Sequence, residues 1–225
     1  MEKMIRTMDG LNLWSESFGK PGDRPILLIM GAMNQGVFWP DAFCTQLASL
    51  GFHVVRYDHR DTGQSSKVDY QAQPYRLAEL TQDALAVLHA HNLPKATVVG
   101  LSMGGYIAQL LAIEHPEAVE RLVLISSSAD QRPYMAATMG QATSDFDLPP
   151  PGPALLEYIR ATTARPPRSP EEIEENLLTG WAITYADSRE FPRAQITAAL
   201  RQAAGLEPRP TQYAHPWPVA PKRAR

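Results

Sequence analysis

The feature that most constrains the fold of this sequence is an alternation of short apolar runs with segments of helical periodicity. Runs such as Pro25–Met30 are apolar throughout, which is typical of a strand buried on both faces of a sheet. Strands that alternate with helices form βαβ units, and their right-handed crossovers produce a parallel sheet. The sequence therefore predicts an α/β fold with a mostly parallel sheet. The expected strands are residues 25–30, 52–57, 96–100 and 121–126, with helices over 38–50, 76–91 and 103–115 and a hairpin of strands 4–8 and 11–18 before them.

The character of the chain changes after Asp130. The cluster Pro149–Pro153 interrupts it, and the segments that follow have helical patterns without strand patterns. Ser169 is placed to cap one of these helices, with Pro170 at its first position. We therefore expect an α/β core over residues 1–130, an inserted helical lid over residues 131–215 and a disordered, proline-rich tail over residues 216–225. The expected lid helices are residues 154–164, a segment from 170 onward and a third that ends at Gly205.

A serine between two glycines, Gly100-Leu-Ser102-Met-Gly104, lies where a predicted strand meets a predicted helix. In such a motif a sharp turn exposes the serine hydroxyl above the sheet, and the glycines prevent collisions between the strand and the helix. A chance match that merely fills a loop is the alternative. The strand before the motif and the helix after it favour a nucleophile, so Ser102 is the candidate catalytic residue.

A serine nucleophile needs hydrogen-bond donors for the oxyanion that forms when it attacks a carbonyl group. The turn itself supplies the backbone N–H of Met103. The second donor is expected in the loop after the strand 25–30, where we assign the N–H of Ala32. The alternative for Gly31-Ala32 is a turn that only ends the strand.

Four stretches together resemble the α/β-hydrolase family: LLIMGAMNQGVFWP, VVRYDHRDTGQSS, VVGLSMGGYIAQ and HPEAVERLVLISSS. More narrowly, they are similar to the branch that contains aclacinomycin methylesterase, which removes a methyl ester from a polyketide side group. The resemblance extends from Met4 to about His215. It implies an esterase that acts on a methyl or other small alkyl ester of a bulky apolar molecule.

In this fold the catalytic acid and the histidine follow the serine along the chain, each after a later strand. Those strands have no counterpart in this sequence, so the sheet is expected to lack its last two strands. Asp130 is the candidate acid, with a hinge residue of the lid as the alternative, and His215 is the candidate base because it lies downstream of Ser102. The other histidines are expected in a strand (His53), at helix ends (His89, His91, His115) and in a loop at the edge of the sheet (His59).

The missing segments predict a serine hydrolase of impaired activity, and a catalytically inactive remnant or small-molecule binding module is the alternative. The abrupt shift to a sequence rich in proline, alanine and arginine near the end suggests a truncated or frameshifted gene. The outer edge of the strand 121–126 is expected to lack a partner, which favours self-association.

Composition excludes several other classes of protein. A formal net charge of −3 with 20% charged residues gives no indication of nucleic acid or of an acidic membrane surface as a partner. The single cysteine, Cys44, excludes an internal disulfide and cannot form a zinc site alone. No apolar run approaches the roughly 18 residues of a membrane-spanning helix, and no signal peptide is recognisable. We expect a cytoplasmic protein with a small-molecule ester as its partner and with no cofactor or metal.

Overall fold

The structure is a computed structural model, and it describes residues 1–185 and 190–204. These residues divide into two compact units. The first contains Met1–Ala129 and the second begins at Asp130. No helix in the described part of the chain is both long and apolar enough to cross a membrane.

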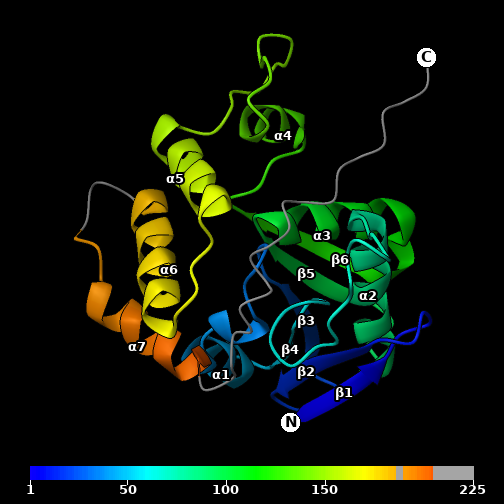
Figure 1. The fold of residues 1–225 in the computed structure, drawn as a ribbon. Coiled ribbons are helices and arrows are strands. Elements are labelled where there is room, and N and C mark those ends of the chain that lie inside the picture. The colour runs from blue at the N-terminus through cyan, green and yellow to red at the C-terminus, as the bar shows by residue number, and fades with distance from the viewer. Residues whose placement is uncertain (186–189, 205–225) are drawn as a thin grey trace. The chain divides into compact units, whose positions relative to one another are not determined.

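The first unit is built on a mixed sheet, which the described residues form with the strand order β1-β2-β4-β3-β5-β6 (Figure 1). β3, β4, β5 and β6 run parallel to one another, whereas β1 and β2 are antiparallel to their neighbours. The predicted α/β fold with a mostly parallel sheet is confirmed. The strands are β1 (Glu2–Arg6), β2 (Asn12–Phe18), β3 (Arg24–Ile29), β4 (Phe52–Tyr57), β5 (Ala96–Leu101) and β6 (Val119–Ile125).

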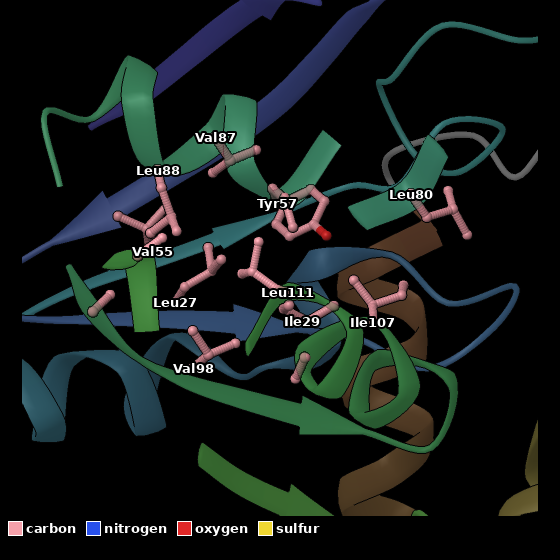
Figure 2. Close-up of a cluster of buried hydrophobic side chains, with 14 of the residues drawn as sticks. Leu27, Ile29, Val55, Tyr57, Leu80, Val87, Leu88, Val98, Ile107 and Leu111 are labelled. Carbon is pink, nitrogen blue, oxygen red and sulfur yellow. The ribbon is translucent and has the colours of Figure 1, made fainter. Parts of the chain in front are cut away.

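Successive side chains of β3 point to opposite faces of the sheet, so they belong to two separate core clusters, one on each face. Leu27 and Ile29 belong to one cluster, which α2 (Leu77–Ala90) and α3 (Met103–Glu114) cover (Figure 2). Ile26 and Leu28 belong to the other cluster, together with Cys44 of α1 (Asp41–Ser49). The apolar run of β3 is therefore continuous because helices bury both of its faces.

Two expected boundaries in the first unit were wrong. The helix expected over residues 38–50 is instead a short 3-10 helix, η1 (Gly36–Phe38), followed by α1, because Pro40 has an extended backbone and takes the capping position of α1. The first strand of the hairpin ends earlier than expected, at Arg6 rather than at Met8. The hydroxyl of Thr7 bonds both Asp9 and the backbone of Leu11, so the turn already begins at Thr7.

β6 is exposed along nearly its whole length. It follows a 3-10 turn, η2 (Pro116–Ala118), pairs with β5 on one edge and has no strand on its other edge among the described residues. The side chains of Leu122, Val123, Leu124 and Ile125 are 37 to 44% exposed. A strand inside a parallel sheet is normally covered on both faces, whereas the described residues leave the apolar side chains of β6 partly open to solvent.

The described part of the second unit is helical. Its helices are α4 (Arg132–Thr138), α5 (Pro153–Ala164), α6 (Pro170–Thr184) and α7 (Arg193–Ala204). α4 was not expected from the sequence, because a seven-residue helix gives little periodic signal. The hydroxyl of Tyr158 in α5 donates to the carbonyl oxygen of Asn176 in α6 at 3.0 Å. Gly180 leaves room for that tyrosine, since a Cβ there would lie 2.7 Å from its hydroxyl oxygen.

The predicted cap of α6 is confirmed. The hydroxyl of Ser169 accepts the backbone N–H of Glu172 at 3.1 Å, and Pro170 occupies the first turn. The carboxylate of Glu172 accepts from the backbone N–H of Arg168 at 2.7 Å. Two donors near the start of the helix are therefore satisfied by side chains.

Candidate active site

Ser102 occupies a strained turn between β5 and α3. Its backbone has φ 52° and ψ −117°, a conformation that residues with a side chain rarely adopt. The N–H of Ser102 donates to the carbonyl oxygen of Ile125 in β6 at 2.9 Å, and the carbonyl oxygen of Ser102 accepts from the N–H of Gly105 at 2.9 Å. These two hydrogen bonds hold the turn, and the serine side chain is half-buried.

The glycines on either side of Ser102 permit a close approach of backbones. A Cβ on Gly100 would collide with the carbonyl oxygen of Gly104, and a Cβ on Gly104 would collide with the carbonyl oxygen of Ile29. Gly105 is equally restricted, because its Cβ would meet the Ser127 hydroxyl. The N-terminus of α3 therefore packs directly against the ends of β3 and β5, as the motif predicts.

The loop after β3 runs beside Ser102. A Cβ on Gly31 would lie 3.4 Å from the Cβ of Ser102, which places the neighbouring Ala32 next to the turn. The carbonyl oxygen of Ala32 accepts from the side-chain amide of Asn34 at 3.1 Å. Within the part of the chain that the structure describes, neither the N–H of Ala32 nor that of Met103 has a hydrogen-bond acceptor. Two unused donors thus belong to segments adjacent to Ser102.

Asp58 follows β4 and is fully buried. Its carboxylate accepts the backbone N–H of Gly36 at 2.7 Å and that of Gln64 at 2.8 Å. Gly63 has φ 46° and lies so close to this carboxylate that a Cβ would overlap it. Burial raises the pKa of Asp58, although both backbone hydrogen bonds favour the charged form.

His59 is buried beside Asp58 and points toward the loop after β3. Its Nε2 lies 2.9 Å from the carbonyl oxygen of Met30. A carbonyl oxygen only accepts, so Nε2 carries the proton and Nδ1, which has no partner among the described residues, is unprotonated. Burial lowers the pKa of His59 to about 4, which keeps the ring neutral. The ring of Tyr57 packs edge-on against it, with 5.2 Å between the ring centroids.

Arg60 ties the same loop to α2. Its guanidinium makes two bonds of 2.7 Å with the carboxylate of Asp83, and it also lies 3.1 Å from Asp9 and over the ring of Tyr75. Both Arg60 and Asp83 are buried. This pair was not predicted from the sequence, although an acid on the apolar face of an expected helix was the available signal.

The candidate acid, Asp130, is the first residue of the second unit. Its carboxylate accepts the backbone N–H of Arg132 at 2.9 Å and pairs with the guanidinium of the same residue at 2.6 Å. The hydrogen bonds from the Arg132 side chain hold the pKa of Asp130 below its ordinary value. The candidate base, His215, lies outside the described residues.

Each remaining histidine has a place away from Ser102. His53 is the second residue of β4 and therefore lies toward the opposite end of the parallel strands from the turn at the end of β5. His91 lies 2.9 Å from the hydroxyl of Ser15, and His115 lies 3.1 Å from the amide of Gln82. His89 is exposed in the last turn of α2. Among the described residues, the hydroxyl of Ser102 makes no hydrogen bond.

The thiol of Cys44 is buried in α1. Burial raises the pKa of this thiol to about 11, so it is an inert packing group at neutral pH. Considering only residues that the structure describes, no three His, Cys, Asp or Glu side chains are grouped as metal ligands.

Comparison with known proteins identifies the relatives of this chain. A family model described as the alpha/beta hydrolase fold matches residues 24–193. The chain is 39% identical to rhodomycin D methylesterase DauP of Streptomyces sp. (strain C5) over 207 residues, which cover 88% of this chain and 69% of that protein. It is 37% identical, with the same coverage, to rhodomycin D methylesterase DnrP of Streptomyces peucetius.

Two solved structures have the same fold as this chain. A hydrolase from Pseudomonas aeruginosa PA01 superimposes with a TM-score of 0.64 at 26% identity, covering 95% of this chain and 69% of that one. An esterase from Exiguobacterium antarcticum shares the fold with a TM-score of 0.69 at 19% identity. The strand–turn–helix geometry around Ser102, the matching family model and the relatives lead to one conclusion: the chain belongs to the α/β-hydrolase fold family.

Proposed function

We propose that this protein hydrolyses carboxylic esters through an acyl-enzyme formed on Ser102. The observation that carries the proposal is the strained turn at Ser102, beside which the N–H groups of Ala32 and Met103 have no acceptor among the described residues. An energetically costly backbone conformation persists where the surrounding structure enforces it, and residues in such conformations are frequent at active sites.

In the proposed reaction, the Ser102 oxygen attacks the ester carbonyl carbon and loses its proton to a base. The N–H groups of Ala32 and Met103 stabilise the resulting oxyanion. Collapse of this intermediate breaks the bond to the alkoxy group, which leaves as the alcohol with the proton from the base. Water, deprotonated by the base, then attacks the acyl carbon. The bond from this carbon to the Ser102 oxygen breaks, the carboxylic acid leaves, and Ser102 regains its proton from the base. We assign the base to His215 and the acid that orients it to Asp130, which must then give up part of its pairing with Arg132.

The proposed substrate is a methyl or other small alkyl ester of a bulky apolar molecule. Support comes from the two relatives at 37 and 39% identity, both named rhodomycin D methylesterases. We expect low turnover, because no group in the described ranges hydrogen-bonds the hydroxyl of Ser102, and a weakly activated hydroxyl is a poor nucleophile.

A second candidate function is small-molecule binding without hydrolysis. It is favoured by the five histidines in the described ranges, all of which are engaged or placed elsewhere than at Ser102. A serine hydrolase that loses one member of its triad keeps only weak activity, which comes from the oxyanion donors and from substrate binding.

Hydrolysis of p-nitrophenyl acetate and of the methyl ester of rhodomycin D tests both candidates, with Ser102→Ala and His215→Ala beside the parent protein. A fluorophosphonate probe followed by peptide mapping identifies the labelled residue. Turnover that both substitutions abolish supports the assigned roles. Labelling at another serine, with Ser102 unmodified, contradicts them, and tight binding of the methyl ester without turnover supports the second candidate.

A further inference from the structure

Two consecutive residues hold both ends of the loop that carries Ala32. We call residues 30–36 the oxyanion loop. At its start, the imidazole of His59 donates to the carbonyl oxygen of Met30 at 2.9 Å. At its end, the carboxylate of Asp58 accepts the N–H of Gly36 at 2.7 Å. Met30 and His59 are 29 residues apart in the sequence, and Gly36 and Asp58 are 22 residues apart, so both contacts are long-range.

We propose that Asp58 and His59 are positioning residues that fix the oxyanion loop so that the N–H of Ala32 is directed at the oxygen of the substrate on Ser102. The inference rests on the proposed function, because it assigns the geometry of the same site. Neither residue touches the reacting atoms. Both act through the backbone of the loop.

The hydrogen bond from His59 restrains the peptide that precedes the oxyanion donor. The Met30 carbonyl oxygen is confined between the imidazole and the start of α3, since a Cβ on Gly104 would lie 2.7 Å from it. Without the imidazole this buried carbonyl would lose its donor, and the Met30–Gly31 peptide would be free to rotate toward another one. That rotation changes the direction of the next peptide, which contains the N–H of Ala32.

Asp58 restrains the other end of the loop. Gly36 packs against the backbone of β4, because a Cβ there would lie 2.5 Å from the carbonyl oxygen of Tyr57. The second carboxylate oxygen of Asp58 accepts the N–H of Gln64, which fixes the carboxylate itself. Small errors in the position of a group near the reacting atoms reduce rates strongly, by up to about a hundredfold for 1 Å.

A purely structural role predicts a different pattern, and Asp83 supplies the matched control. Asp83 is buried, is paired with Arg60 from the same segment as Asp58 and His59, and makes no contact with residues 30–36 in the hydrogen bonds described. Asp83→Asn weakens the fold without touching the oxyanion loop. His59→Met removes the donor at similar volume, whereas His59→Gln places an amide nitrogen near the position of Nε2.

Two measurements test the proposal. The first is amide hydrogen exchange over residues 30–36. The second is the labelling of Ser102 by a fluorophosphonate at several probe concentrations, which gives the rate constant at saturation and the affinity for the probe separately. We expect exchange in the oxyanion loop to be roughly tenfold faster in His59→Met than in the parent protein. We also expect labelling at saturating probe to slow roughly tenfold with little change in affinity. His59→Gln should restore both, and Asp83→Asn should change neither.

Equal exchange in the parent and in His59→Met would overturn the proposal, as would equal slowing of labelling in His59→Met and Asp83→Asn. If His59→Met does not fold, His59→Asn, whose amide is too short to reach Met30, takes its place. Failure of the proposed function has a separate signature. The parent would then remain unlabelled at Ser102 while the exchange in the oxyanion loop still responded to His59→Met.

Discussion

The backbone N–H of Ser102 lies 2.9 Å from the carbonyl oxygen of Ile125, so the candidate nucleophile is joined to the last residue of the most exposed strand in the sheet. Ser102 directly follows β5, whose last residue, Leu101, pairs in register with Ile125 of the adjacent parallel strand β6. Motion of β6 is therefore transmitted through this hydrogen bond to the turn at Ser102. The stability of the exposed edge and the geometry at Ser102 are properties of one hydrogen-bonded unit.

Replacement of Ser102 with glycine should stabilise the protein. Serine at φ 52° is strained, whereas glycine adopts positive φ without steric cost. We expect Ser102→Gly to unfold with a free energy about 1 kcal/mol higher than that of Ser102→Ala, which keeps the strain. Urea denaturation followed by circular dichroism measures the difference. Equal stability of the two variants would show that the turn is relaxed.

Replacement of Gly104 with alanine should destabilise the protein by about 1–3 kcal/mol, the usual cost of overpacking a tight site. The new methyl group would collide with backbone atoms of β3, which have little freedom to move. Gly152→Ala is the control, because its Cβ meets no atom within 4 Å and its φ is −61°. Thermal unfolding of both variants provides the measurement. A stable Gly104→Ala protein would contradict the close packing of α3 on β3.

Acid should destabilise the fold through His59. Its pKa is about 4 in the folded protein and about 6.5 in the unfolded chain. Between these values the unfolded state binds a proton that the folded state does not, so stability is full above pH 6.5 and falls as the pH drops toward 4. The loss assigned to this residue is about 3 kcal/mol.

Chemical denaturation at pH 7, 5.5 and 4.5 tests this dependence. His59→Gln should reduce the pH dependence, because glutamine does not titrate. His89→Gln, at an exposed position of α2, should leave it as in the parent protein. An identical pH dependence in the parent and His59→Gln would contradict the buried neutral imidazole.

The protein should self-associate through the outer edge of β6. Unpaired N–H and C=O groups beside partly exposed apolar side chains favour pairing with another chain. Val123→Lys introduces a charge at the most exposed of these apolar positions, which is 44% exposed, and should reduce association. Leu50→Lys is the control, since Leu50 is 62% exposed and follows α1 rather than β6.

Light scattering combined with size-exclusion chromatography measures this association. A parent protein that remains monomeric at high concentration would contradict the prediction. Equal association of the two lysine variants would place the contact elsewhere on the surface.

The sequence predicted those parts of the site that depend on neighbouring residues. Gly100, Ser102 and Gly104 lie within one turn, so their spacing already describes the strand–turn–helix geometry. The contacts of Asp58 and His59 with the oxyanion loop could not be predicted in the same way. They join segments more than twenty residues apart, and only the parallel pairing of β3 with β4 brings them together.

Periodicity also failed where an element is short or a residue breaks the pattern. α4 has seven residues and was missed, and Pro40 divides the helix expected over residues 38–50. Buried Asp83 was assigned only to a helix, because its pairing with Arg60 depends on tertiary structure. Charges on an apolar face are therefore a useful sign of such pairs in this fold.

The hydrogen bonds and backbone contacts that shape the surroundings of Ser102 come entirely from residues between Ile29 and Ser127, all of which belong to the first unit. The strained turn, the close backbone contacts and the two unused donors are therefore encoded by one continuous stretch of the gene. A sequence that inherits this stretch inherits them together.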